Sequence, residues 1–228
     1  MSRTGWSSTN FMRGTTLPVS AAPLTISAWG YTSIAASNTQ DMVGLYKSSA
    51  TGNIDCFRLA LDVSAVIFQA NNGSASGTAT TSQGPSTNTW FHAAGVQASA
   101  TSRAAYFNGG FKGTDTLSRT PAGIDRASIG KRDNVSSDNN FGRTGTGYLA
   151  DVAMWNVALT DAEILSLSLG FSPLLVRPSG LVFYSPLYGV GSNEPNLINS
   201  AAEATINGTL TQGIHPPIIM PRRPLITL

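Results

Sequence analysis

Hydrophobic and polar residues alternate with a period of two along much of this chain, which is the pattern of half-buried β-strands. The alternation is clearest in residues 24–31, which follow Pro23, a residue suited to the start of a strand. The dipeptide Asn108-Gly109 predicts a tight hairpin turn, because both residues tolerate a positive φ. The pattern predicts further strands at residues 41–47, 54–62, 63–70, 89–98, 103–107, 127–130, 148–157, 181–187 and 205–210.

One stretch predicts a helix, and it begins with a capping box at Thr160. In such a box the Thr160 hydroxyl accepts from the Glu163 amide, while the Glu163 carboxylate accepts from the Thr160 amide. Apolar residues continue to Leu169, and Gly170 is a suitable residue to end the helix. The rest of the chain reads as strand and loop, so the predicted class is all-β.

Three stretches depart from this pattern. Residues 1–20 are polar and irregular, and residues 71–88 predict either a weak strand with loops or a long exposed excursion. Residues 173–213 are expected to form an extension of strand and loop. Residues 214–228 are rich in proline, which excludes a helix or a central strand, so we expect an extended C-terminal arm.

Composition and charge narrow the set of partners. Only 11% of the 228 residues are charged, against about 25% in globular proteins. The net charge of +2 gives no electrostatic reason to expect nucleic-acid binding. Eleven of the 14 basic residues are Arg, a preference that favours protein interfaces.

The single cysteine, Cys56, cannot form an intrachain disulfide and is expected to be a small buried hydrophobe. The N-terminal residues show no apolar signal-peptide core. No window approaches the roughly 20 apolar residues of a membrane span. These features predict synthesis in a reducing cytoplasm and no membrane span.

The block of residues 90–169 resembles the laminin-G-like, or concanavalin A-like, jelly-roll family. The resemblance covers about residues 15–172 and implies a sandwich of two antiparallel sheets with one short helix. We expect this domain to span residues 1–172, including the N-terminal segment 1–20. The extension 173–213 and the arm 214–228 then follow. The matching segments are residues 90–94, 103–109, 127–130, 147–156 and 158–164, with residues 24–31 similar to the family's opening strand.

The family includes glycan-binding, adhesive and viral structural proteins, so the fold does not determine the function. Because a signal peptide and a disulfide are not expected, the chain looks more like members carried on tailed-phage virions. Our first hypothesis is a non-enzymatic virion structural protein, a capsid decoration or head or tail-fibre component made in the host cytoplasm. It would form a homo-oligomer and dock on other virion proteins through the arm. The expected arm interface is His215, Pro216, Pro217, Ile218, Ile219, Arg222, Arg223, Leu225 and Ile226.

The alternative hypothesis is a carbohydrate-binding, lectin-like module for host recognition or adhesion. It needs exposed aromatic side chains and polar loops, for which residues 71–88 and 131–147 are the candidates. Trp29, Trp90 and Trp155 lie on predicted strands and are expected in the core. Trp6 lies outside those strands, so it is the best candidate for an exposed sugar platform or a subunit contact, although packing of the N-terminal segment is the favoured interpretation even there.

Catalysis is not expected. Glycosidases of this fold class use paired carboxylates at a defined separation, and the chain has only three Glu residues. Glu163 belongs to the predicted helix cap, and Glu194 and Glu203 lie in loops. His92 reads as a structural residue among apolar neighbours, and His215 as an interface or turn residue.

One oxygen-rich loop is a candidate for calcium. It contains Asp133 and Asp138 as the carboxylate candidates, with Asn134 and Asn139 beside them. Calcium takes six to eight oxygen ligands, and the spacing matches no defined calcium loop. An ordinary solvated loop is therefore favoured and no cofactor is expected. Carboxylates that could assist from elsewhere are Asp41, Asp62 and Asp151.

Overall fold

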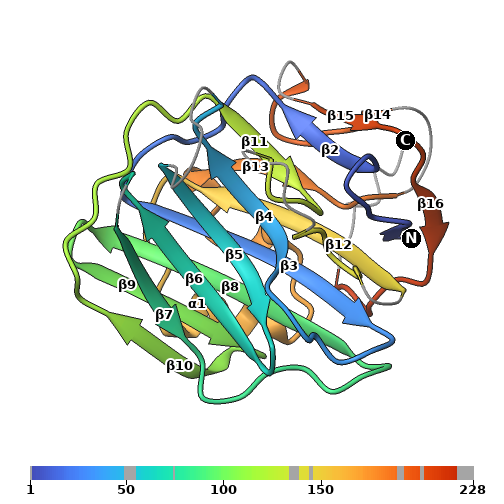
Figure 1. Ribbon diagram of the computed structural model, residues 1–228, viewed down its shortest axis with the longest axis horizontal. Coiled ribbons are helices and arrows are strands. Elements are labelled where there is room, and N and C mark those ends of the chain that lie inside the picture. The colour runs from blue at the N-terminus through green and yellow to red at the C-terminus, as the bar shows by residue number, and fades with distance from the viewer. Residues whose placement is uncertain are drawn as a thin grey trace, which may run out of the picture.

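The fold is a sandwich of two antiparallel β-sheets packed face to face (Figure 1). This is a computed structural model, which describes residues 2–48, 55–73, 75–133, 139–143, 146–188, 193–200 and 203–219. The predicted all-β class with one short helix is confirmed.

We call the two layers sheet A and sheet B. Sheet A has the order β10-β9-β8-β3-β12-β1-β16, with β13 also paired to β12. Its strands are β1 (Ser2–Thr4), β3 (Leu24–Thr32), β8 (Trp90–Ser99), β9 (Ser102–Phe107), β10 (Gly110–Asp115), β12 (Gly147–Trp155), β13 (Leu181–Ser185) and β16 (Thr211–Gly213).

Sheet B has the order β14-β15-β2-β11-β4-β5-β6-β7 and lies in front of sheet A in Figure 1. Its strands are β2 (Phe11–Gly14), β4 (Gln40–Tyr46), β5 (Cys56–Asp62), β6 (Ala65–Asn71), β7 (Ser76–Thr80), β11 (Arg126–Ile129), β14 (Asn193–Glu194) and β15 (Ala204–Asn207).

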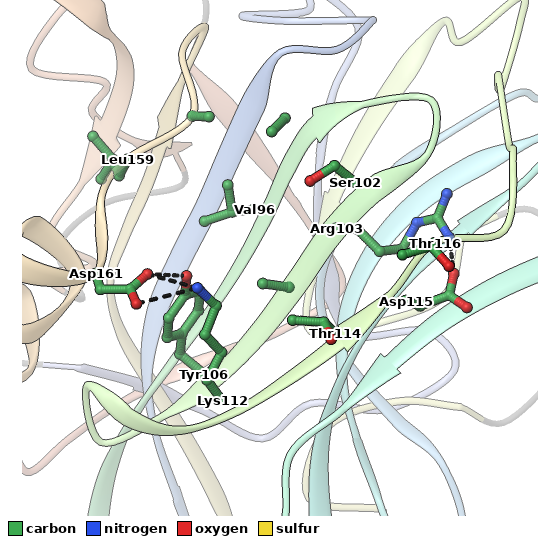
Figure 2. Close-up of a pocket in the computed structure, with 13 residues that line it drawn as sticks. Val96, Ser102, Arg103, Tyr106, Lys112, Thr114, Asp115, Thr116, Leu159 and Asp161 are labelled. Atoms are coloured by element: carbon green, nitrogen blue, oxygen red, sulfur yellow. Dashed lines mark hydrogen bonds and ion pairs between the residues drawn. The ribbon is translucent and has the colours of Figure 1, made fainter.

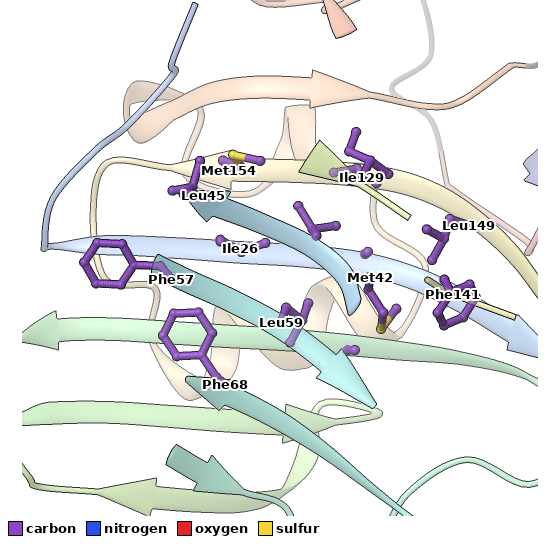
Figure 3. Packing of buried hydrophobic residues seen from close by; sticks show 14 of the residues in the cluster. Ile26, Met42, Leu45, Phe57, Leu59, Phe68, Ile129, Phe141, Leu149 and Met154 are labelled. Carbon is purple, nitrogen blue, oxygen red and sulfur yellow. The ribbon is translucent and has the colours of Figure 1, made fainter. Parts of the chain in front are cut away.

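The main hydrophobic core fills the space between the sheets. Period-two alternation sends Leu24, Ile26 and Ala28 of β3 into it. Sheet B contributes Phe57 and Phe68, which meet the sheet A residues in Figure 3. The other face of sheet A, which we call its outer face, points away from this core and makes a separate set of contacts.

The helix α1 (Asp161–Ser168) packs over one end of the outer face of sheet A. Its predicted capping box is present, since the Glu163 amide donates to Thr160 Oγ1 at 3.4 Å and the Thr160 amide to Glu163 Oε2 at 2.8 Å. Ile164 and Leu167 pack there with Trp155. Two 3-10 turns follow, η1 (Pro173–Leu175) and η2 (Pro178–Gly180). In the described ranges, no helix has both the length and the apolar character of a membrane span.

The three stretches that depart from clear alternation all contribute strands to the sheets. Residues 1–20, predicted to be irregular, contain β1 and β2, and residues 71–88 contain β7. Residues 173–213 supply β13 and β16 to sheet A, and β14 and β15 to sheet B. The described strands therefore do not divide at residue 172. Strands were predicted at the positions of β13 and β15, and a weak strand was one alternative for the region of β7. β1, β2, β14 and β16 were not predicted. Such short strands are held by partners far away in sequence, such as Arg3 opposite Leu149 and Gln212, so local alternation does not reveal them.

Candidate functional site

Four aromatic side chains gather at the end of sheet A's outer face that α1 leaves uncovered. Because Ile26 and Ala28 face the core, Trp29 and Tyr31 point to the outer face of β3. The neighbouring strands place Trp90 and Tyr148 on the same face, where strand register sets both residues opposite Tyr31.

We call Trp90, Tyr31 and Tyr148 the aromatic row. The ring centroids of Tyr31 and Trp90 lie 5.9 Å apart, those of Tyr31 and Tyr148 5.2 Å apart, and those of Trp90 and Tyr148 6.3 Å apart. All three rings are half-buried, so each is packed at one edge and keeps accessible surface. A partly exposed aromatic cluster of this kind marks a ligand-binding or interaction surface.

Polar groups border the aromatic row. Tyr31 OH donates to Asn88 Oδ1 at 3.0 Å, which holds the phenol in place. Trp29 lies next to the row, with its ring centroid 5.5 Å from that of His92. His92 Nε2 lies 2.8 Å from Ser27 Oγ, and burial lowers the pKa of His92 to about 3. His92 is therefore a neutral structural residue beneath the row.

The tryptophans are distributed differently from the sequence-based expectation. Trp155 is fully buried, as predicted, whereas Trp29 and Trp90 are half-buried on the outer face. Trp6, the candidate for an exposed platform, is instead packed with the N-terminal segment: it is only 6% exposed, and its Nε1 donates to the Arg3 carbonyl at 3.2 Å. It belongs to the main core and offers no sugar platform. Period-two alternation could have placed Trp29 on the outer face. Ile26 points to the core, and a residue three positions later on the same strand points to the opposite face.

A groove of about 390 Å³ crosses β8, β9 and β10 beside the start of α1 (Figure 2). At one end, Asp161 accepts from Tyr106 OH at 2.7 Å and pairs with Lys112 Nζ at 2.8 Å. These hydrogen bonds lower the pKa of Asp161. At the other end, Arg103 pairs with Asp115. Because these charged groups are paired with one another, the groove offers a ligand fewer free polar groups. The aromatic row is therefore the stronger candidate site.

The candidate calcium loop is organised differently from the prediction. Asp133 forms a bidentate pair with Arg13, at 2.5 and 2.6 Å, and lies 3.5 Å from Arg126. Two guanidinium groups thus occupy the carboxylate proposed for calcium. The Asn139 carbonyl accepts from the Asp41 amide at 3.1 Å. Asn134 and Asp138 lie outside the described residues.

The assisting carboxylates are also engaged elsewhere. Asp41 pairs with Arg58 at 2.8 Å, and Asp62 accepts from Thr39 Oγ1 at 2.8 Å. Asp151 lies in a different cavity, with Tyr184 and His215. Across the described parts of the chain, no group of three or more His, Cys, Asp or Glu side chains is placed to hold a metal ion.

Two of the three glutamates have structural partners, and Glu194, expected in a loop, lies in β14. Glu163 pairs with Arg177 at 2.6 Å, and this hydrogen bond lowers the pKa of Glu163. Glu194 is buried and pairs with Arg3 at 2.5 Å.

The described part of the arm lies against its own domain. His215 Nε2 is 3.1 Å from Asp151 Oδ2, and Pro216 is buried. The Ile219 carbonyl accepts from the Ser172 amide at 3.0 Å. Pro217 and Ile218 lie between these contacts, and Pro217 approaches Gly170. The remaining predicted interface residues, Arg222, Arg223, Leu225 and Ile226, are outside the described residues.

Comparisons with known proteins agree with the fold. The model of the concanavalin A-like lectin/glucanases superfamily matches residues 7–165. A protein of Bacteroides ovatus ATCC 8483, to which carbohydrate binding is ascribed, is similar at 17% identity with a TM-score of 0.64. That match covers 96% of this chain, which spans 62% of the Bacteroides protein.

Two other solved structures share the fold. The heptameric SAP-like pentraxin of Limulus polyphemus is 16% identical with a TM-score of 0.57, covering 90% of this chain and 95% of the pentraxin. The sialidase module CBM40 of Ruminococcus gnavus, bound to α2,3 sialyllactose, is 15% identical with a TM-score of 0.52, covering 69% and 83%. No curated protein sequence matches the chain. These comparisons give no support to the expected link with tailed-phage virions.

Proposed function

Because this chain belongs to the concanavalin A-like lectin/glucanases superfamily, we propose that it is a carbohydrate-binding module that holds glycans on the outer face of sheet A. The observation that carries this proposal is the aromatic row, in which Trp90, Tyr31 and Tyr148 line up across three adjacent strands. Aromatic rings combine a large apolar face with polar edges, and a sugar ring presents the complementary apolar and hydroxyl groups.

The rigidity of the row supports this proposal. The rings stand on neighbouring strands in the middle of sheet A, and Asn88 restrains the Tyr31 hydroxyl. A site on strands loses little conformational entropy when a ligand binds. The Bacteroides and Ruminococcus proteins are similar in fold and are described by their carbohydrate binding, which adds to the case.

Replacing Trp90 or Tyr148 by alanine should weaken glycan binding at least tenfold, which corresponds to about 1.4 kcal/mol. The measurement is a glycan array followed by calorimetric titration with the best-bound glycan. Phe111→Ala is the matched control, because Phe111 is an exposed aromatic residue of the same sheet, on β10 away from the row. Unchanged affinity in both row variants, or no binding by the unaltered protein with and without calcium, would refute the proposal.

This function requires no catalytic pair, and the absence of enzymatic activity stays a prediction. The virion role and location also stay predictions, in which residues 214–228 dock on another virion protein or on a second copy. Ile214 and Ile219 at the start of the arm are exposed, which is the feature that supports docking.

Deleting residues 214–228 should leave both sheets intact, because the last strand that the structure describes, β16, ends at Gly213. If the arm drives assembly, light scattering will show an oligomer for the full chain and a folded monomer for residues 1–213. The same oligomeric state for the two proteins would contradict an assembly role.

A further inference from the structure

A cavity of about 400 Å³ lies beside the end of β8 that is remote from the aromatic row. Trp90 is the first residue of β8, whereas the cavity is lined by Ala98 and Ser99, the last two residues of this strand. Its volume is within the range of small-molecule sites. The cavity is therefore a candidate site separate from the proposed glycan surface.

The walls of this cavity are mostly apolar. They come from residues 21–22 before β3, Phe57 of β5, the end of β8 with Ala100, and residues 119–121 after β10. Phe57 belongs to the main core, and most of the other wall residues are small. Because burying apolar area is favourable, such walls select a ligand with an apolar body. They offer few partners to the hydroxyls of a sugar, which would lose their hydrogen bonds to water.

Arg119 carries the only formal charge among the described residues that line this cavity. No carboxylate in the described ranges pairs with it, which sets Arg119 apart from most arginines of this protein. Six others each pair with an Asp or Glu side chain: Arg3, Arg13, Arg58, Arg103, Arg126 and Arg177. A cation without a partner in a largely apolar cavity favours an anionic ligand.

The guanidinium group of Arg119 keeps donors that a ligand can reach. Nη1 donates to the Ser118 carbonyl at 2.6 Å, and Nε is buried without an acceptor. Nη2 is neither fully buried nor hydrogen-bonded to a described residue, and the side chain as a whole is half-buried. Ser99 adds a hydroxyl beside it, whose oxygen accepts from the Thr101 amide at 3.3 Å while its proton can still be donated.

Hydrogen bonds hold the two loops of the cavity together. The Arg119 amide donates to the Ala100 carbonyl at 2.9 Å. Arg103 Nη2 donates to the same carbonyl at 2.9 Å and to the Leu117 carbonyl at 2.8 Å. The charge of Arg103 is offset by Asp115, so it does not compete for a ligand. Walls held in this way lose little entropy when a ligand binds.

We propose that this cavity binds a small carboxylic acid with an apolar body, whose carboxylate pairs with Arg119 and whose body packs against Phe57 and the alanines. A guanidinium group matches a carboxylate through two parallel hydrogen bonds. One guanidinium also matches the single charge of a carboxylate, whereas a phosphate dianion would keep one charge unpaired. The site goes beyond the proposed glycan binding and does not depend on it.

The test is an NMR titration of the full chain with three probes at constant ionic strength: benzoate, benzyl alcohol and glucuronate. Benzyl alcohol keeps the aromatic body without the charge, and glucuronate keeps the carboxylate on a body covered with hydroxyls. Benzoate should bind at least tenfold more tightly than either of the other two. No benzoate binding at millimolar concentrations, or benzoate binding no tighter than that of benzyl alcohol or glucuronate, overturns the proposal.

Two variants locate the site. Arg119→Gln should weaken benzoate binding at least tenfold, because the charge-assisted hydrogen bonds are lost. Ala100→Leu should weaken it similarly by filling part of the cavity, with the Arg119 side chain unchanged. Arg177→Gln is the matched control, because it removes the same charge beside α1, where Arg177 pairs with Glu163.

Unchanged benzoate affinity in Arg119→Gln or in a folded Ala100→Leu overturns the proposal. An equal loss in Arg177→Gln also overturns it, since net charge rather than this cavity would then explain the binding. Glycan binding should be the same in Arg119→Gln and the unaltered protein. Failure of the benzoate experiments therefore leaves the proposed function standing, and failure of the glycan experiments leaves this site standing.

Discussion

Replacing Trp155 by alanine should lower the free energy of unfolding by about 3–5 kcal/mol, the usual cost of deleting a large buried aromatic side chain. Trp155 ends β12 and is fully buried between sheet A and α1. Its Nε1 donates to the Val176 carbonyl at 3.0 Å, so the variant also leaves that carbonyl without its partner.

Denaturant unfolding of the two proteins measures this difference. Trp90→Ala is the matched control, because it removes the same side chain from a half-buried position on the same sheet. Trp90→Ala should lower the free energy of unfolding by clearly less, since the half-buried Trp90 ring removes less apolar area from water than the Trp155 ring does. Equal costs for the two variants would show that the packing of α1 on sheet A is not as described.

Acidification should destabilise the protein through His92. Burial lowers its pKa from 6.5 to about 3, so the unfolded chain takes up a proton in a pH range where the folded protein does not. The contribution of His92 to stability is fully present above pH 6.5. It is lost as the pH falls from 6.5 toward 3, at about 1.4 kcal/mol per pH unit.

Comparing unfolding free energies at pH 7 and pH 4 isolates this contribution. His92→Gln cannot titrate, so it should lose roughly 3 kcal/mol less than the unaltered protein over this interval. Protonation of paired carboxylates affects both proteins and cancels in the comparison. Identical losses in the unaltered protein and His92→Gln would contradict a buried neutral imidazole.

The local signals in the sequence were sufficient for the central strands and the helix. The capping box at Thr160 and the Asn108-Gly109 turn depend on residues a few positions apart, and both are present. Strands β3, β8 and β12 show clear alternation because one face of each packs against the main core.

The candidate sites were less predictable. Trp29 and Trp90 were expected in the core because a large aromatic residue on a strand is usually buried. How much of the outer face of sheet A stays exposed depends on how far α1 extends over it. The Asp133 carboxylate was a calcium candidate until the fold brought Arg13 to it from 120 positions away in sequence. The cavity around Asp151 joins β12 to the arm, two segments that share no local pattern.

By itself, the sequence determined the all-β class, the resemblance to the jelly-roll family, the single capped helix and most strand positions. These features follow from hydrophobic periodicity and short-range hydrogen bonds, which depend only on residues within the same segment. The tertiary structure alone decided which strands residues 2–14 and 193–213 pair with, and where Trp6 is buried. It also decided that Trp90, Tyr31 and Tyr148 form one surface. The physical reason is that these features depend on pairing and burial between distant segments, whose energies appear only when the sheets assemble.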